Sequence, residues 1–202
     1  MDKPLVVIVQ GSPRMDGNCA ALALDAFNAC DARGCDAVIV SASMLMTSGG
    51  HPCNGCENCV STGSCVYEDE VTLLYQMLDS ASGLLWITPI YFASVPGQLK
   101  AMIDRFQFFW ARRSRGETLK FETRRPAAAL IVGSGNDPFG TEAVEIPLTS
   151  ASNIAEFNLS KPTVLMELDE PDAILREENA GMREIAHETI RTFVDAVLKW
   201  EG

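Results

Sequence analysis

The sequence predicts an α/β fold, a three-layer sandwich built on a five-stranded parallel sheet in the order 2-1-3-4-5. Two observations predict it. Short aliphatic or β-branched runs alternate with longer segments of helical periodicity. The first run, Leu5–Val9, is continuously apolar, as in a strand that is covered on both faces. Because strands that alternate with helices form mostly parallel sheets with right-handed crossovers, we expect residues 1–202 to form a single domain of this class.

The first half of the chain supplies two strands and two helices. After Leu5–Val9, residues Asn18–Arg33 have helical spacing, and Gly34 ends the run. Ala37–Val40 is the second strand, and a cysteine-rich loop at 51–66 follows it. Asp69–Ser80 is the second helix, and its apolar residues fall on one face: Val71, Leu74, Tyr75 and Leu78.

The second half supplies three strands and two helices. Gly83–Ile87, Ala127–Val132 and Val164–Met166 are the strands. Pro96–Trp110 is a helix that starts at proline, with an apolar stripe of Leu99, Met102, Ile103, Phe106 and Trp110. The last helix, Asp172–Trp200, turns a second stripe inward: Ile185, Ile190, Phe193, Val194 and Val197. Five strands in this rhythm are typical of the flavodoxin-like sheet, whose ligand lies where the loops after strands 1 and 3 meet.

Composition and charge exclude several classes of protein. The chain of 202 residues is 47% hydrophobic and carries a formal charge of −11, which argues against nucleic acid or an anionic membrane as a partner. The N-terminal run MDKPLVVIVQG lacks the features of a signal peptide. We find no stretch of the roughly 18 apolar residues that a membrane span needs. We therefore expect a cytoplasmic protein whose thiols stay reduced.

The loop after the first strand, QGSPRMDGN at residues 10–18, has the groups of a phosphate site. Gly11 permits a tight turn, Ser12 offers a hydroxyl and Arg14 a bidentate guanidinium. Asn18 offers an amide at the expected cap of the next helix, whose start supplies free N–H groups. The spacing fits neither a Walker loop nor a dinucleotide fingerprint. The alternative is an ordinary polar turn with a solvated arginine.

The loop after the third strand, TPIYFASVPG at residues 88–97, has the groups of a site for a planar ring. Two prolines stiffen the edge, and main-chain groups of residues 90–93 are placed to bond the polar rim of a heterocycle. Tyr91 and Phe92 would flank that ring. The alternative is that both aromatics belong to the core, which is their more common fate.

Together these segments carry a family resemblance. GSPRMDGN and TPIYFASVPGQLKAMIDRF, with the cysteine loop between them, resemble the NADPH-dependent FMN reductase superfamily, and within it the iron–sulfur flavoproteins. The compact run C-x2-C-x2-C-x4–7-C of those flavoproteins is matched by Cys53, Cys56, Cys59 and Cys65. The resemblance covers about residues 5–135. It implies an FMN-binding domain and a homodimer or homotetramer with the flavin near a subunit interface.

The resemblance also implies which residues contact the flavin. The phosphate would be held by Ser12, Arg14, Asn18 and the amides of Cys19 and Ala20, and the isoalloxazine ring would be lined by Pro89, Ile90, Tyr91 and Phe92. The chain departs from the family in the loop VGSGNDPFGTE, where isolated glycines replace a glycine pair. Ser134, which lies in this loop, is the residue that the resemblance would place against the flavin there.

Four of the seven cysteines lie within residues 53–65. Two x2 spacings place three sulfurs around one tight loop, as in bacterial ferredoxins, and Cys65 follows a Ser-Thr-Gly stretch that permits the chain to turn back. We favour a [4Fe–4S] cluster held by Cys53, Cys56, Cys59 and Cys65. Free thiols and a zinc site are the alternatives.

These features predict an FMN-dependent redox enzyme. It would transfer electrons between a two-electron donor such as NAD(P)H and one-electron carriers such as ferredoxin, through FMN and the cluster. We predict no catalytic residue, because no side chain need act as acid or base. One alternative is an NAD(P)H-dependent FMN or quinone reductase with free cysteines, and another is a non-enzymatic carrier or thiol redox sensor.

Six of the sixteen basic residues lie between positions 112 and 125: Arg112, Arg113, Arg115, Lys120, Arg124 and Arg125. They are placed either to receive a nicotinamide phosphate or an acidic redox partner, or to balance nearby acids on a solvated loop. The second interpretation is the more common one for such a run of charges.

Overall fold

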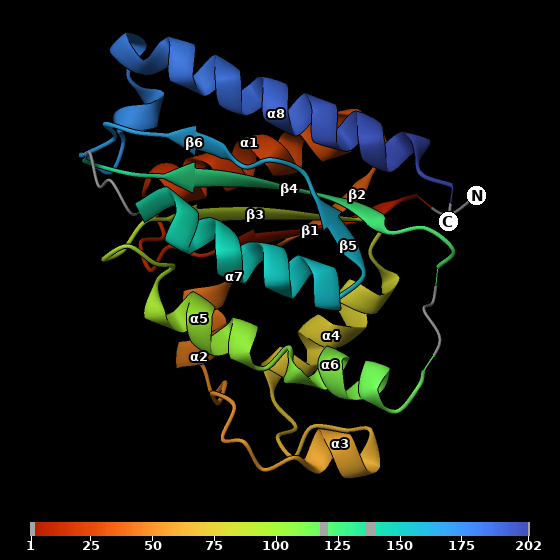
Figure 1. The fold of residues 1–202 in the computed structure, drawn as a ribbon. Coiled ribbons are helices and arrows are strands. Elements are labelled where there is room, and N and C mark those ends of the chain that lie inside the picture. Colours follow the sequence, from red (N-terminus) through yellow and green to blue (C-terminus); the bar gives the residue numbers. More distant parts are fainter. Residues whose placement is uncertain (1–2, 118–120, 136–139, 202) are drawn as a thin grey trace.

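A parallel sheet forms the middle layer of the computed structural model, which describes residues 3–117, 121–135 and 140–201 (Figure 1). The strand order is β2-β1-β3-β4-β5, with β6 also on β4, so the predicted order 2-1-3-4-5 is confirmed. The strands are β1 Leu5–Gln10, β2 Asp36–Ser41, β3 Gly83–Pro89, β4 Arg125–Val132, β5 Phe157–Leu159 and β6 Thr163–Leu165.

Two short strands share the fifth position of the sheet. β5 pairs with the first half of β4, and β6 pairs with the second half. The prediction for the fifth strand, Val164–Met166, was one residue late and missed β5. Between the two strands Ser160 still donates to the carbonyl oxygen of Ala127, but Pro162 follows and has no N–H to continue the ladder.

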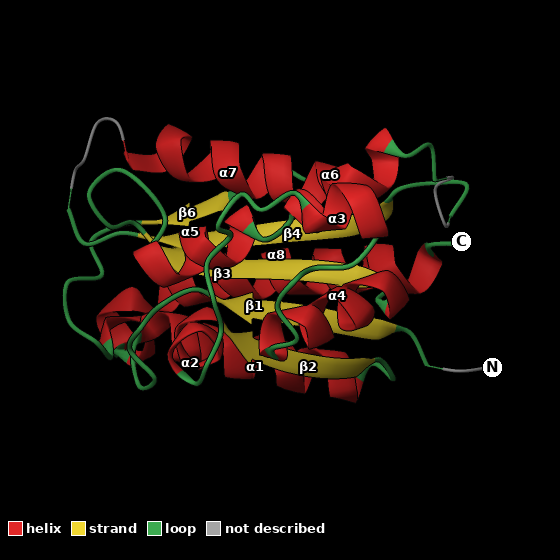
Figure 2. Cartoon of the chain, turned by 90° about the horizontal axis from the view of Figure 1, so that it is seen from below, coloured by secondary structure: helices red, strands yellow, loops and turns green. Residues whose placement is uncertain are grey.

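Helices cover both faces of the sheet, as Figures 1 and 2 show. On one face lie α1 Asn18–Ala32 and α8 Ala180–Lys199, preceded by the short turns η1 Ala173–Leu175 and η2 Glu177–Asn179. On the other face lie α2 Ala42–Thr47, α4 Glu70–Ser80, α5 Gly97–Asp104, α6 Gln107–Ser114 and α7 Gly140–Ile154. The small helix α3, Asn58–Thr62, lies outside this layer against α6. None of the described helices is long and apolar enough to cross a membrane.

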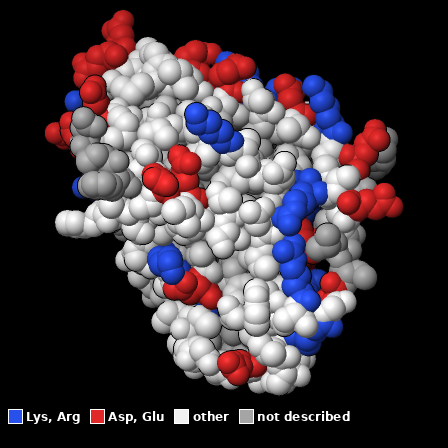
Figure 3. Space-filling view, viewed as in Figure 1, with Lys and Arg blue, Asp and Glu red and all other residues white. Residues whose placement is uncertain are grey.

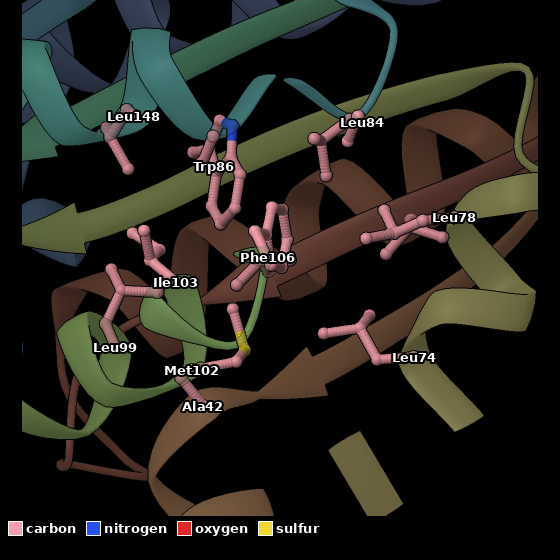
Figure 4. Close-up of a cluster of buried hydrophobic side chains, with 14 of the residues drawn as sticks. Ala42, Leu74, Leu78, Leu84, Trp86, Leu99, Met102, Ile103, Phe106 and Leu148 are labelled. Atoms are coloured by element: carbon pink, nitrogen blue, oxygen red, sulfur yellow. The ribbon is translucent and has the colours of Figure 1, made fainter. Parts of the chain in front are cut away.

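The alternation of side chains along each strand creates two separate cores. In β1, Val7 faces the α4–α7 side and Ile8 faces the α1–α8 side. Trp86 of β3 lies in the first of these cores near Phe106 (Figure 4). Its indole Nε1 donates to Ser152 Oγ of α7 at 2.9 Å, so the one polar atom of this buried ring is satisfied.

The prediction of one helix over Pro96–Trp110 was wrong, because the chain turns between α5 and α6. The amides of Arg105 and Phe106 bond to carbonyl oxygens three residues back, at 3.1 and 2.8 Å, which tightens the helix and redirects it. Phe106 stays in the core, but Trp110 is 48% exposed instead of completing the predicted stripe.

Two other helices also differ from the prediction. The last helix begins at Ala180 and not at Asp172, and Ile185 is exposed instead of facing inward. The sequence pattern predicted no helix over Gly140–Ile154, where α7 lies. Pro147 inside that helix and its many small polar residues weaken the helical signal.

The basic segment mainly serves the fold. Arg112 pairs with Asp79 at 2.8 Å, and Arg115 donates to the carbonyl oxygen of Cys59. Arg125 is 2% exposed and donates to main-chain carbonyl oxygens at the ends of α4 and α7. Lys120 lies outside the described residues. Figure 3 shows a row of basic side chains in the part of the molecule where α6 and β5 lie, with acidic side chains beside it, as expected for a solvated face that balances its own acids.

Candidate functional site

The strands β1, β3, β4 and β6 run parallel and end at one edge of the sheet, where their loops enclose a cavity of about 130 Å³. The loops after strands 1 and 3 therefore meet, as predicted. The cavity is lined by most of the predicted flavin contacts: Ser12, Arg14, Asn18, Cys19, Pro89, Ile90, Tyr91 and Ser134. Phe92 lines an adjoining cavity, and Ala20 lines neither of the two.

The loop after β1 is held in a shape that leaves several donors available. Ser12 is buried, and its Oγ accepts the Arg14 N–H at 3.1 Å, so the hydroxyl hydrogen is still available to a ligand. Gln10 Nε2 donates to the Arg14 carbonyl oxygen at 3.1 Å. Arg14 is exposed and lines the cavity, so its guanidinium is available to a ligand. The loop can thus offer a hydroxyl and a planar cation to an anion.

The helix cap differs from the prediction. Gly17, and not Asn18, is the N-cap of α1. The Asn18 side chain turns away to hold the loop after β6, donating to the carbonyl oxygens of Leu168 and Glu170 and accepting from the Ile174 N–H at 2.9 Å. The N–H groups of the first helical residues have no intrahelical acceptor, but that of Ala20 already donates to the Gly17 carbonyl oxygen. The amides of Asn18 and Cys19 are therefore the ones placed to meet a phosphate.

The thiol of Cys19 is not a reactive group in this cavity. Its side chain is buried in the core on the α1–α8 side, and burial raises the pKa of the thiol to about 12. The sulfur is therefore neutral and unreactive at neutral pH.

Gly11 allows the loop to pass close to its neighbours. A Cβ there would lie 2.6 Å from Leu99 Cδ2 and 2.8 Å from Thr88 Oγ1. We expect Gly11→Ala to destabilise the fold by about 1–3 kcal/mol through overpacking, measured by urea unfolding. Gly97→Ala is the matched control, since a Cβ at Gly97 meets nothing within 4 Å. Equal stability of the two variants would contradict the close approach.

The adjoining cavity of about 430 Å³ is lined by Ile90, Tyr91, Phe92, Gly133, Ser134, Gly135 and Met166. Tyr91 and Ser94 exchange hydrogen bonds at 2.9 and 3.1 Å and so close a tight turn. Phe92 and Ala93 between them have φ values of 47° and 53°, a conformation that costs energy for residues other than glycine and that clusters at functional sites. Phe92 is fully exposed and not a core aromatic.

The hydrogen bonds of the turn leave only some main-chain N–H groups free to bond a ring. The Ile90 N–H already donates to the Val132 carbonyl oxygen at 2.9 Å, and the Tyr91 N–H donates to Ser94. The N–H groups of Phe92 and Ala93, at the tip of the turn, are the ones placed to reach a heterocycle. This is a smaller set than the predicted run from Ile90 to Ala93.

Sequence reasoning missed the third wall of the site, the loop at 166–171. Leu168 N–H donates to the Gly133 carbonyl oxygen at 3.1 Å, and Asp169 and Pro171 line the smaller cavity. A Cβ at Gly133 would lie 2.6 Å from Met166 Sδ, so this glycine permits the close contact between the loops. The rule that loops share the carboxyl edge of a parallel sheet, applied to the last strand, would have found this loop.

The four predicted cysteine ligands line a separate cavity of about 540 Å³ between the cysteine loop and α6. Cys53 and Cys56 are exposed, and Cys59 and Cys65 are half-buried. Positive φ values of 69° at Gly55, 58° at Glu57 and 85° at Gly63 let the chain curve around the cavity. Figure 1 shows this region below α6, away from the strand ends that form the other site.

The four thiols influence one another electrostatically. Burial, and then the charges of Cys65, Cys53 and Cys56, raise the pKa of Cys59 above its ordinary value. A bound metal centre would reverse this shift, because thiolates are its ligands. Among the described residues no group of three or more His, Cys, Asp or Glu is arranged to hold a metal ion as the side chains stand. The four thiols line one cavity and are the donors that a four-thiolate centre needs, but their side chains are not gathered into a ligand set in this structure.

The donors around the first site fit the group that the resemblance implies. A guanidinium, a hydroxyl and two helix-terminal amides suit a phosphate, and the larger cavity beside them lies against an aromatic turn. Ser12, Arg14 and the amides of Asn18 and Cys19 would hold the FMN phosphate, and the Tyr91–Ser94 turn would meet the ring. These assignments stay predictions.

Comparison with known proteins gives one family. Residues 4–155 match the family described as NADPH-dependent FMN reductase. An iron-sulfur flavoprotein of Methanocaldococcus jannaschii is 27% identical over 168 residues, which cover 83% of this chain and 78% of that protein. Another, from Archaeoglobus fulgidus, is 23% identical over 211 residues, covering 98% of this chain and all of that protein.

Solved structures share the fold. The NAD(P)H:quinone oxidoreductase from Methanothermobacter marburgensis matches with a TM-score of 0.65 over 100% of both chains, at 13% identity. The family match spans the loops after β1 and β3 that line the two cavities at the strand ends, as well as the cysteine loop. The chain therefore belongs to the NADPH-dependent FMN reductase family and is an NAD(P)H-dependent oxidoreductase.

Proposed function

We propose that this oxidoreductase transfers electrons between NAD(P)H and one-electron carriers such as ferredoxin, using FMN and a [4Fe–4S] cluster held by Cys53, Cys56, Cys59 and Cys65. The observation that carries the proposal is the presence of two separate groups of cavities in one chain. One group lies at the strand ends and is lined by the loops after β1 and β3, where we propose the flavin, and the other is a cavity lined by the four cysteines. The names of the flavoprotein relatives also support the second site.

The chemistry would come from the bound groups. FMN accepts two electrons as hydride and can release them singly, and a cluster exchanges one electron at a time. The residues of this chain bind and orient. Arg14 and Ser12 would anchor the phosphate, and the strained Tyr91–Ser94 turn would hold the ring edge, with Phe92 exposed beside it.

Anaerobic purification followed by a visible spectrum tests this proposal. Flavin gives two bands, and a cluster adds a broad shoulder with iron and sulfide in stoichiometric amounts. Bleaching of the flavin bands by NAD(P)H checks the donor, and transfer of the electrons to ferredoxin checks the one-electron branch. A chain that binds no FMN when supplied with excess would contradict the entire proposal.

Cys56→Ala is expected to remove the iron and keep the FMN. Cys56 is exposed, so its loss does not disturb the core, and the flavin cavity shares no lining residue with the thiol cavity. Iron and FMN are measured on the same anaerobic sample. Ser61→Ala, an exposed change in the same loop, is the matched control and should keep both. Iron that persists in Cys56→Ala would show that the ligand assignment is wrong.

A second candidate is a cluster-free NAD(P)H-dependent FMN or quinone reductase. Two observations favour it: the exposure of Cys53 and Cys56, and the absence among the described residues of a ready metal-binding arrangement. It predicts full NAD(P)H-dependent flavin reduction in the Cys56→Ala variant, and no iron in the parent chain.

We further propose a homodimer or homotetramer and a cytoplasmic location, where the thiols stay reduced. Exposed apolar side chains near both sites, such as Phe92 and Trp110, support an interface between subunits. Light scattering of the FMN-loaded protein measures the assembly directly, and a monomer at micromolar concentration would contradict it.

A further inference from the structure

One side chain joins the two ends of the segment that carries the four cysteines. Arg105, at the turn between α5 and α6, is 2% exposed. Its Nη1 donates to the carbonyl oxygen of His51 at 2.7 Å and to Asp69 Oδ2 at 2.8 Å, and its Nη2 donates to Asp69 Oδ1 at 3.0 Å. His51 precedes the first of the four cysteines and Asp69 follows the last, so the guanidinium closes residues 51–69 into a ring.

The surroundings fix this guanidinium in one orientation. Its Nε donates to Tyr75 Oη at 3.2 Å, and that hydroxyl in turn donates to the Arg105 carbonyl oxygen at 2.8 Å. The Tyr67 ring lies 5.2 Å from the guanidinium carbon. Burial raises the pKa of Asp69, but hydrogen bonds from Arg105 and His51 outweigh burial and hold that pKa well below its usual range. The pair is therefore ionised at neutral pH.

One N–H group of the Arg105 guanidinium is not used by these hydrogen bonds. A guanidinium has five N–H groups, and four of them are used by His51, Asp69 and Tyr75. The fifth, on Nη2, has no acceptor among the described residues, and Arg105 lines the same cavity as the four thiols. A buried cation with a spare donor beside four thiols is placed to meet a negatively charged group.

We propose that Arg105 is the positioning residue of the four-cysteine site: it closes the loop 51–69 and presents its remaining N–H and its charge to the anionic thiolate centre. This inference rests on the proposed function, since the thiolate centre is the cluster proposed above. Lysine is a poor substitute, because a single ammonium cannot span a carbonyl oxygen, a carboxylate and a phenol as a planar fork does. Arg105 acts through the cysteines and is not itself catalytic.

Loop closure is tested by proteolysis of the full-length FMN-bound chain with a glutamate-specific protease. Glu57 lies inside the loop, in a left-handed conformation between Cys56 and Asn58, so cleavage there needs the loop to open. We expect Arg105→Gln and Arg105→Lys to be cleaved after Glu57 at least about tenfold faster than the parent chain. A factor of ten corresponds to a decrease of about 1.4 kcal/mol in the free energy of loop opening. Mass spectrometry of the fragments follows that one site.

Arg112→Gln is the matched control. Arg112 lies on the neighbouring helix α6 and pairs with Asp79 and Glu117 at 2.8 and 2.9 Å, but it does not line the thiol cavity. Its variant should be cleaved after Glu57 at the parent rate. If Arg105→Gln does not fold, as judged by FMN retention, Arg105→Lys carries the test, because it keeps a charge opposite Asp69.

The charge of Arg105 is tested on the iron-loaded protein. Partners outside the ligand shell typically change metal affinity 10–100-fold, so we expect Arg105→Gln to lose iron to a chelator about 10–100-fold faster while FMN is retained. The midpoint potential of the cluster should fall in Arg105→Gln and recover in Arg105→Lys, which a purely structural role would not produce. An unchanged cleavage rate at Glu57, an equal acceleration in the Arg112 variant, or a potential of Arg105→Gln equal to that of the parent chain overturns the proposal. A parent chain that takes up no iron contradicts the proposed function instead, and the cleavage result still decides whether Arg105 closes the loop.

Discussion

Replacing Arg14 by methionine is expected to weaken FMN binding about 10–100-fold and to leave riboflavin binding unchanged. A hydrogen bond to a charged group contributes about 1.5–3 kcal/mol, and each 1.4 kcal/mol is a factor of ten in affinity. Riboflavin lacks the phosphate, so it cannot lose a contact with the guanidinium. Methionine keeps most of the length of the side chain and removes the charge. Fluorescence titration of the flavin-free protein with both ligands measures the two affinities.

The geometry of the loop makes this a test of the side chain. Arg14 contributes to the fold through its main chain, whose N–H and carbonyl oxygen bond to Ser12 and Gln10. The substitution leaves these bonds in place. Arg33→Met is the control, since Arg33 caps the far end of α1 and pairs there with Asp195. Equal losses for FMN and riboflavin in Arg14→Met would mean that the phosphate lies elsewhere.

Arg125→Met is expected to destabilise the fold by about 3–5 kcal/mol, because it leaves three buried carbonyl oxygens without a donor, at about 1–3 kcal/mol each. The guanidinium donates to the carbonyl oxygens of Leu78, Ala81 and Ala155, and its carbon lies 3.9 Å from the Phe157 ring centroid. Leu78 and Ala81 lie at the end of α4, and Ala155 follows α7, so two negative helix ends converge on one cation. Methionine would leave the carbonyl oxygens buried without donors.

Thermal unfolding measures this effect. For a chain of this size a loss of 3–5 kcal/mol corresponds to a decrease in Tm of about 6–20 °C. Burial lowers the pKa of Arg125 to about 10, partly opposed by the charges of Glu156 and Asp79, so the residue is still a cation at neutral pH. Arg191→Met is the control, because Arg191 forms exposed pairs with Glu184 and Glu188 that contribute little. A Tm of Arg125→Met within a degree or two of the parent would contradict this role.

Arg125 and Arg105 show where a pattern of charges in the sequence gives the wrong interpretation. In the sequence, Arg125 ends a basic segment that is typical of a solvated loop or a partner surface, and local spacing does not reveal that it is buried. Its partners lie 30 to 47 residues away, on the ends of two helices. Arg105 likewise falls in a helical run, and the bridge from it to His51 and Asp69 exists only once α5 turns into α6. Long-range main-chain acceptors leave no local signature.

The sequence by itself determined the sheet order, the two loops that meet at its edge and the grouping of four cysteines in one loop. These follow from local periodicity, glycine and proline positions and the rule that parallel strands end together. Tertiary structure decided the rest: the split fifth strand, the third wall at 166–171, the use of Asn18 as a brace and the closure of the cysteine loop by Arg105. Each of these depends on contacts between segments distant in sequence, whose energies are set by packing and by buried hydrogen bonds and not by local propensity.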